Sequence, residues 1–144
     1  MVFGPLPQIE LRADRRRLLC DVLVLGPDNP VQFEGFRGRA LIDTGATSSG
    51  IGPAPIAKLG LRSHGKKTLG SATEEKMVDY YLFRLALQHG GDGDVVPAWP
   101  FVFDRIDGFS WRREAQFDVI VGMDILMQCD LHLQRGGACT LRFG

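Results

Sequence analysis

Apolar and polar residues alternate in several short runs along the chain, a pattern typical of β-strands. Such runs at residues 8–12, 18–25, 31–36 and 39–43 predict strands in the first third of the sequence. A longer run at 77–88 is apolar on both faces and predicts a buried strand. A further strand is predicted at 98–103, followed by a polar loop at 107–114.

Helical signals are few and short. Residues 53–59 predict one helix, because Pro53 stands at its start and Gly60 directly follows its end. At 117–126 an apolar run ends at Gly122 and leads into a second short helical pattern, with Asp124 at the expected N-cap. A last hairpin is predicted at 129–143, turning at Gly136 and Gly137. The pattern therefore predicts an all-β fold with one or two short helices.

The apolar run that ends at Asp43 leads directly into Thr44 and Gly45. A strand fixes the backbone that carries the carboxylate, and Gly45 has no Cβ, so another backbone or a substrate can approach closely. Water attack on a peptide carbonyl needs two neighbouring carboxylates, one acting as base and one as acid. Only one Asp-Thr-Gly occurs here. The second carboxylate would therefore have to come from a second copy of the chain, with the Thr44 hydroxyls bonding across the two-fold axis.

Two segments together, Asp-Thr-Gly-Ala at 43–46 and Ile-Val-Gly at 120–122, resemble the retropepsin-like aspartic proteases. The resemblance implies the acid-protease fold in its one-lobe form, a closed β-barrel or sandwich in which the second segment packs beneath the first. It also implies a flap hairpin over the site, for which residues 66–87 are the candidate, with the tip near 70–73.

The resemblance implies an aspartic endopeptidase that acts as a homodimer on extended peptide or protein substrates. It places Asp43, Thr44 and Gly45 in the catalytic centre. The residues it assigns to substrate binding are Ala46, Thr47, Leu69, Gly70, Ser71, Ala72, Thr73, Ile120 and Val121.

Two positions differ from the viral members of this family. Those members commonly carry an aspartate where Thr47 stands and an arginine where Met123 stands, and both partners of that ion pair are absent here. Losing both leaves no unpaired buried charge, which favours a cellular or bacterial branch of the family. The segments 7–11 and 139–143 look like the terminal strands that form the viral dimer sheet, although the hairpin at 129–143 would allow a different dimer sheet.

Composition limits the other possibilities. A chain of 144 residues with 44% apolar residues suits one domain over 1–144 and is too short for a two-lobed pepsin. The net charge is zero, and the one tight basic cluster, residues 15–17, is interpreted as a solvated turn, so no nucleic acid partner is expected. No run approaches ~18 apolar residues, so no membrane span is expected. A membrane-anchored parent chain stays open.

The cysteines and histidines do not suggest a cofactor. Three cysteines form neither an even disulfide framework nor a Cys-x-x-Cys metal motif, which favours free thiols and a cytoplasmic location. The three histidines lie in different predicted elements, so neither a metal site nor a Cys-His nucleophile is expected. Ser48 and Ser49 lack a Gly-x-Ser-x-Gly surround and are interpreted as turn hydroxyls.

Two alternatives to a protease remain at this point. The first is a retropepsin fold kept as a non-catalytic dimerisation or peptide-binding module. The second rests on a faint resemblance of residues 43–47 to the phosphorylated Asp-Lys-Thr-Gly-Thr of P-type pumps and related phosphohydrolases, which need magnesium and an α/β fold with long helices. The near absence of long amphipathic helices argues against the second.

Overall fold

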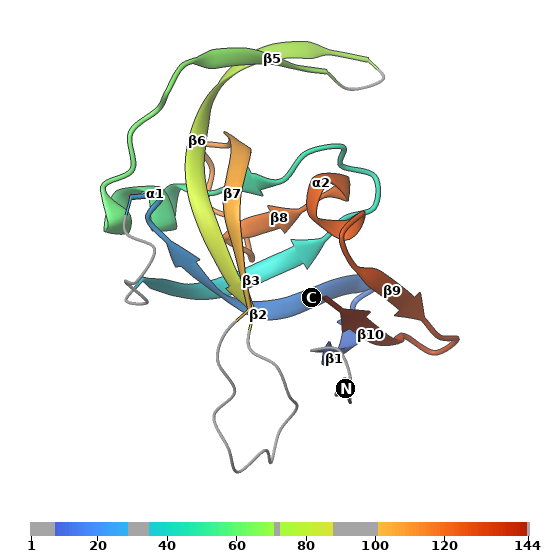
Figure 1. Ribbon diagram of the computed structural model, residues 1–144. Helices are drawn as coiled ribbons and strands as arrows, with labels where there is room; N and C mark the ends of the chain where they lie inside the picture. The colour runs from blue at the N-terminus through green and yellow to red at the C-terminus, as the bar shows by residue number, and fades with distance from the viewer. Residues whose placement is uncertain (1–7, 29–34, 71–72, 88–100, 144) are drawn as a thin grey trace.

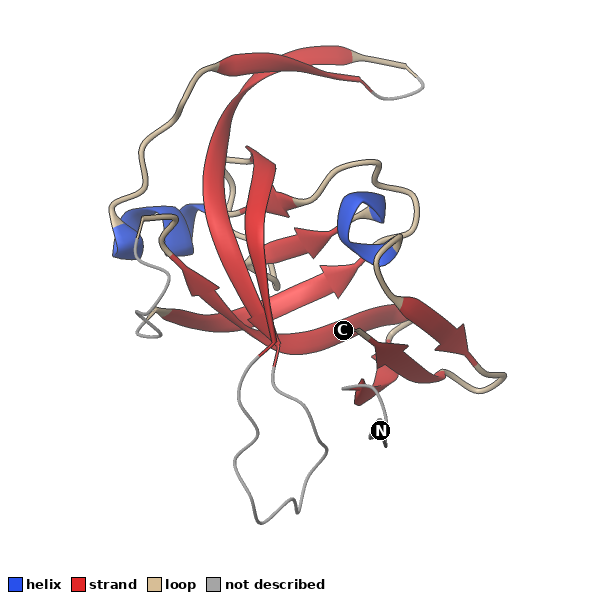
Figure 2. Ribbon diagram, in the orientation of Figure 1, coloured by secondary structure: helices blue, strands red, loops and turns tan. Residues whose placement is uncertain are grey.

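The computed structural model describes residues 8–28, 35–70, 73–87 and 101–143 (Figure 1). Strands dominate this part of the chain and the two helices are short (Figure 2), so the all-β prediction is confirmed. The strands are β1 (Gln8–Asp14), β2 (Arg17–Leu25), β3 (Phe36–Ile42), β4 (Gly50–Ile51), β5 (Lys66–Gly70), β6 (Glu75–Leu87), β7 (Phe101–Ser110), β8 (Val119–Val121), β9 (Asp130–Leu133) and β10 (Ala138–Arg142). The helices are α1 (Pro53–Leu59) and α2 (Met123–Leu126).

A closed barrel forms the centre of the molecule. Its strands pair in the order β6-β7-β4-β8-β3-β2, and β6 also pairs with β2, which closes the ring. The residues that point inward are apolar and fully buried, among them Val24, Phe83 and Val119. Because burial of apolar surface is the main favourable term in folding, this core holds the strand ends that carry the site in place.

A smaller layer of β1, β10 and β9 continues the sheet beyond β2. Gln8 pairs with Arg142 and Arg12 with Ala138, so the two terminal strands pair within one chain. Buried Phe143 anchors this layer to the barrel, its ring 5.2 Å from that of Phe101. The segments that resemble a viral dimer sheet are thus already paired with each other, and β9 forms the outer edge of the described sheet.

The hairpin of β5 and the first half of β6 leaves the barrel and arches over the side on which α2 lies (Figure 1). The prediction of a strand at 77–88 is confirmed, since β6 covers nearly all of it. The prediction that this strand is buried on both faces is wrong for its first part. Met77 is 61% exposed, because this part of β6 pairs only with β5 and has no barrel strand behind it.

Several element boundaries differ from the sequence prediction. The helix at 53–59 is confirmed, and Gly60 ends it in the left-handed conformation with φ 61°. The strand predicted at 39–43 begins earlier, at Phe36, and residues 31–34 lie outside the described residues. The loop predicted at 107–114 is wrong over its first four residues, because β7 continues to Ser110. Pairing of Phe109 and Ser110 with the distant strand β4 extends β7, and no local pattern signals that contact.

No helix in the described ranges is long and apolar enough to cross a membrane.

Candidate active site

Asp43 is the first residue after β3, at the point where the barrel strand ends. Its backbone N–H donates to the carbonyl oxygen of Val121 at 2.9 Å, which continues the parallel pairing of β3 with β8 by one residue. This bond ties the backbone of the aspartate to the barrel. The side chain is half-buried.

The turn after Asp43 holds its carboxylate in a defined position. The Gly45 N–H donates to Asp43 Oδ1 at 2.9 Å, and the Ala46 N–H donates to the Asp43 carbonyl oxygen at 3.2 Å. A Cβ on Gly45 would lie 3.2 Å from Asp43 Oδ1, so the absent side chain leaves room for the carboxylate. Thr44 and Thr47 are exposed on this turn. The carboxylate is therefore positioned by backbone groups, a stiff arrangement that suits a catalytic base.

The late glycine segment packs directly beneath this turn. The Met123 N–H donates to the Ala46 carbonyl oxygen at 2.8 Å. A Cβ on Gly122 would lie 2.6 Å from the Ser48 carbonyl oxygen and 2.8 Å from that of Ala46, so only glycine fits here. The two segments that carry the family resemblance thus meet in space, although nearly eighty residues separate them.

Ser49 links the same two segments through its side chain. It is fully buried, accepts a hydrogen bond from the Gly122 N–H at 3.0 Å and donates one to Asp124 Oδ1 at 2.7 Å. The N-cap of α2 is Gly122, so the prediction that Asp124 occupies the N-cap is wrong. Asp124 lies in the first helical turn, where its Oδ1 accepts hydrogen bonds from the Ser49 hydroxyl and, at 3.0 Å, from the Ile125 N–H. Sequence reasoning missed Ser49, because its partners lie more than seventy residues away.

The other residues predicted to bind substrate fall into three groups. Leu69, Gly70 and Thr73 lie on the flap hairpin, whereas Ser71 and Ala72 are outside the described residues. Ile120 is half-buried beside the active turn, and Val121 reaches the site only through its carbonyl, since its side chain is 2% exposed and packs in the core. Their contact with a peptide stays a prediction.

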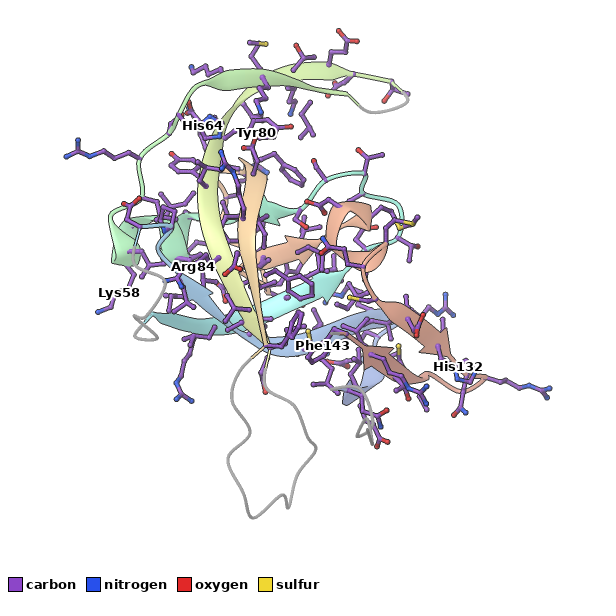
Figure 3. The ribbon with its side chains drawn as sticks, in the orientation of Figure 1. Lys58, His64, Tyr80, Arg84, His132 and Phe143 are labelled. Carbon is purple, nitrogen blue, oxygen red and sulfur yellow. The ribbon has the colours of Figure 1, made fainter. Side chains whose placement is uncertain are left out.

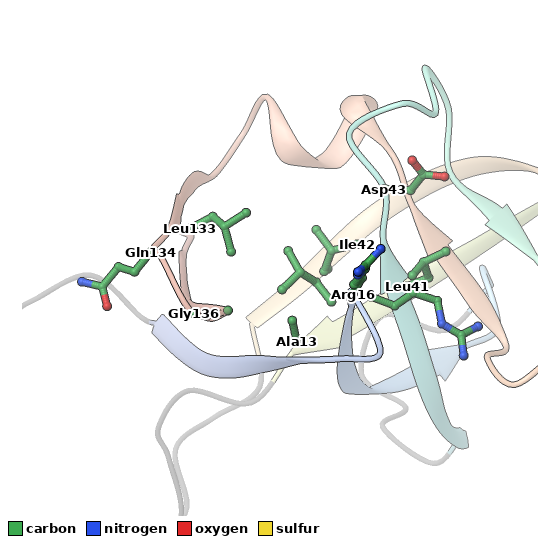
Figure 4. Close-up of a pocket in the computed structure, with 11 residues that line it drawn as sticks. Ala13, Arg16, Leu41, Ile42, Asp43, Leu133, Gln134 and Gly136 are labelled. Carbon is green, nitrogen blue, oxygen red and sulfur yellow. The ribbon is translucent and has the colours of Figure 1, made fainter.

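A groove with a volume of about 680 Å³ adjoins Asp43 (Figure 4). The end of β3, the turn between β1 and β2, and the hairpin between β9 and β10 enclose it. Its lining residues are Ala13, Arg16, Arg17, Leu18, Leu41, Ile42, Asp43, Leu133, Gln134, Gly136 and Gly137.

A polar cluster anchors the base of the flap. Asp107 on β7 accepts hydrogen bonds from His64 Nε2 and Lys67 Nζ, each at 2.6 Å. Lys67 also lies 4.8 Å from the ring centre of Tyr80, which, like His64, lies beneath the flap in Figure 3. Burial raises the pKa of Asp107, but the bonds from Lys67 and His64 outweigh it, and the net pKa is lower than the usual 3.8. The cluster therefore couples the flap strand β5 to the barrel strand β7.

The lowered pKa of Asp107 predicts how this anchor responds to acid. A carboxyl whose pKa is lower in the folded chain stabilises the fold above its unfolded value of 3.8, and the effect is lost as pH falls through the folded value. The stability lost in Asp107→Asn should therefore be fully present near pH 5 and shrink below about pH 4. It should stay below about 1 kcal/mol because the groups are partly exposed. Urea unfolding of wild type and Asp107→Asn at a series of pH values measures this difference in the free energy of unfolding. A difference that grows in acid would contradict the role of Asp107 as an ionised anchor.

The thiols offer no competing nucleophile. Burial, aided by Asp21 and Cys139, raises the pKa of Cys20 to about 12, and burial with Asp130 raises that of Cys129 to about 11. Both thiols stay protonated at neutral pH and are poor nucleophiles. Among the described residues no group of three or more His, Cys, Asp or Glu side chains is arranged to hold a metal ion.

The sequence around this site matches a known protein family. The family model described as "Aspartyl protease" matches residues 29–125, which include the Asp43 turn, the flap and Gly122. This chain belongs to the aspartyl protease family. The all-β fold also excludes the phosphohydrolase alternative, which requires an α/β fold.

Among solved structures, a retropepsin-like aspartic protease from Rickettsia conorii is similar to this family member over nearly the whole of both chains. The match covers 99% of this chain and 98% of that one, with a TM-score of 0.63 and 15% identity. The fold is therefore the retropepsin-like acid-protease fold, as the sequence predicts. None of the curated proteins matches the chain.

Proposed function

We propose that the protein is an aspartic endopeptidase whose active site forms between two copies of the chain, with Asp43 from each as the catalytic pair. The observation that carries the proposal is the Asp43 carboxylate held by the Gly45 N–H at the end of a barrel strand. One chain of this family member supplies one such carboxylate, whereas the reaction uses two. Self-association about an axis through this turn supplies the second.

The proposed mechanism follows from the chemistry of two adjacent carboxyl groups. Two carboxylates in contact repel each other, so the pair holds one proton between them. The ionised Asp43 takes a proton from a bound water as the water oxygen attacks the peptide carbonyl carbon. The protonated Asp43 donates a hydrogen bond to the carbonyl oxygen and then a proton to it, forming the tetrahedral diol. Proton transfer to the amide nitrogen then allows the C–N bond to break.

The flap supplies the second part of the proposal. The exposed edges of β5 and β6 near Gly70 and Thr73 carry backbone groups that can pair with an extended peptide. The anchor at Asp107 fixes the base of this hairpin and leaves its outer end outside the barrel. Closure over the peptide would exclude water from the site. Peptide substrates with apolar side chains on either side of the cleaved bond should suit such a site. The free thiols support a reducing compartment such as the cytoplasm.

A mixing experiment tests whether the site is shared. Wild type is incubated with an equal amount of Asp43→Asn until subunits exchange, and cleavage of a peptide library is followed with an aspartic-protease inhibitor as a control. Because only dimers with two intact aspartates should react, activity per wild-type chain should fall to about half of its unmixed value. Native mass spectrometry measures the heterodimer fraction.

The outcomes separate the proposal from its rival. Activity per wild-type chain that is unaffected by the variant, despite heterodimer formation, would show that one chain suffices. A stable dimer that neither cleaves peptides nor binds the inhibitor would instead favour the non-catalytic dimerisation or peptide-binding module.

A further inference from the structure

The groove that Asp43 lines carries two arginines and a largely apolar remaining surface. Arg16 and Arg17 belong to its lining, and Asp43 is the only carboxylate among the lining residues (Figure 4). Leucine and isoleucine side chains from β2, β3 and β9 supply most of the remaining surface. A groove of this kind suits a ligand with an apolar stem and an anionic end.

The turn that presents Arg16 is unusual in its backbone. Asp14 pairs with Arg17, so β1 and β2 are joined by the two residues Arg15 and Arg16, with φ values of 50° and 67°. They are the only non-glycine residues with positive φ in the described part of the chain. Two-residue hairpin turns of this type favour Asn-Gly, because side chains other than Asn, Asp and Gly are strained there.

The turn of the neighbouring hairpin has glycine at its positive-φ positions. Gly136 and Gly137 take φ values of 90° and 94° in the turn between β9 and β10, which lines the same groove. Backbone geometry therefore does not explain two arginines in the first turn. Strained residues that persist are concentrated at functional sites, which directs attention to the arginine side chains.

Arg16 is free to bind a ligand. Arg17 donates a hydrogen bond to Gln116 Oε1, whereas no ion pair within the described ranges involves Arg16. Asp14 lies opposite Arg17 on the paired strands and is not part of the groove lining. The turn also lies outside residues 29–125, so the family match does not account for it.

We propose that Arg16 forms an electropositive subsite beside Asp43 that selects peptides carrying an aspartate or glutamate side chain close to the cleaved bond. The inference rests on the proposed endopeptidase function and names a substrate class for it. A guanidinium group binds a carboxylate through two parallel hydrogen bonds, and the apolar walls of the groove accommodate the methylene groups of the acidic side chain.

Matched peptides test the subsite. Each pair differs by one Glu or Gln, placed in turn at positions on both sides of an apolar cleavage site, and is assayed at about pH 6, where free Glu is ionised. The wild type should favour Glu over Gln about two- to fivefold in kcat/KM at one position, the effect of one partly exposed ion pair. Arg16→Glu should reverse the preference at that position, and raised salt should weaken that of the wild type.

The turn offers two matched variants. Arg15→Glu makes the same charge change in the same turn at a residue that does not line the groove, so it should keep most of the preference. The double variant Arg15→Asn with Arg16→Gly has the residues that such a turn favours, so it should fold at least as well as wild type and lose the preference.

Binding of uncleavable peptides separates this inference from the proposed function. Reduced-amide analogues of the Glu and Gln peptides are titrated into wild type and each variant by calorimetry, with the dimer fraction recorded for each. A Glu preference in binding supports the subsite even if the enzyme cleaves nothing, which would count against the proposed function alone. Equal affinities for the Glu and Gln peptides in wild type would overturn the Arg16 subsite, and so would a Glu preference that survives in Arg16→Glu. Arg16→Glu that changes only the dimer fraction also overturns it and assigns the groove to the contact between copies.

Discussion

Asp43→Asn is expected to lose peptide cleavage almost completely, by about three orders of magnitude or more in kcat. Asparagine keeps an oxygen that can accept the Gly45 N–H, and the backbone bond from residue 43 to Val121 does not depend on the side chain. The variant should therefore fold and self-associate as wild type does. Its amide cannot take a proton from water, so the chemical step fails. Single-turnover cleavage assays beside urea unfolding measure the two effects separately.

Asp104→Asn is the matched control for this loss. Asp104 is an exposed carboxylate on β7, outside the Asp43 turn and the groove. The same change of carboxylate to amide there should leave cleavage within about twofold and stability within about 0.5 kcal/mol. Inhibitor-sensitive cleavage by Asp43→Asn at the wild-type rate would remove Asp43 from the mechanism.

Gly122→Ala is expected to have the second largest effect, and it acts on both stability and activity. The backbone of Gly122, with φ −96° and ψ −170°, is open to any residue, so the cost is steric. A methyl group there would meet the Ser48 carbonyl oxygen at 2.6 Å and carbon at 2.7 Å, which are backbone atoms of the active turn. Forcing them apart should cost about 3 kcal/mol. The same shift displaces Asp43, so cleavage should fall about a hundredfold, as expected for a displacement of about 1 Å.

Gly26→Ala tests whether the loss is specific to this contact. A Cβ on Gly26 would meet no atom within 4 Å, and its φ is not in the left-handed region. The free energy of unfolding of this variant should lie within about 0.5 kcal/mol of the wild-type value. Urea titrations give the stabilities, and kcat/KM on one peptide gives the activities. If the Gly122→Ala protein were as stable and active as the Gly26→Ala protein, the close packing of the two segments would not matter.

Local sequence signals predict much of the candidate site. The apolar run before Asp43 and the apolar run before Gly122 both end where the structure ends β3 and β8. Proline at the start and glycine after the end correctly mark α1, and the Gly136–Gly137 turn correctly marks the last hairpin. Each of these signals depends on backbone preferences of residues that are neighbours in the chain.

Other features depend on contacts between residues far apart in sequence. Strand β7 is longer than its pattern predicts because β4 pairs with its end, and the N-cap of α2 is Gly122, whose N–H donates to the hydroxyl of the distant Ser49. The interpretation of residues 15–17 as a solvated turn omits that Arg16 and Arg17 line a groove with Asp43. Periodicity describes which face of a strand is apolar, but not which distant strand or side chain it meets.

The family resemblance led us to expect the flap hairpin, whereas the residue pattern itself determined the carboxylate turn, the glycine at position 122 and the strands that end at both. These are short-range features, set by side-chain alternation and by where glycine and proline permit the backbone to turn. Only the tertiary structure decided that β6 closes the barrel on β2, that the terminal strands pair within one chain, and that Arg16 and Asp43 line the same groove. Closure of the barrel makes these contacts, because it brings together strand ends whose order in space differs from their order in the chain.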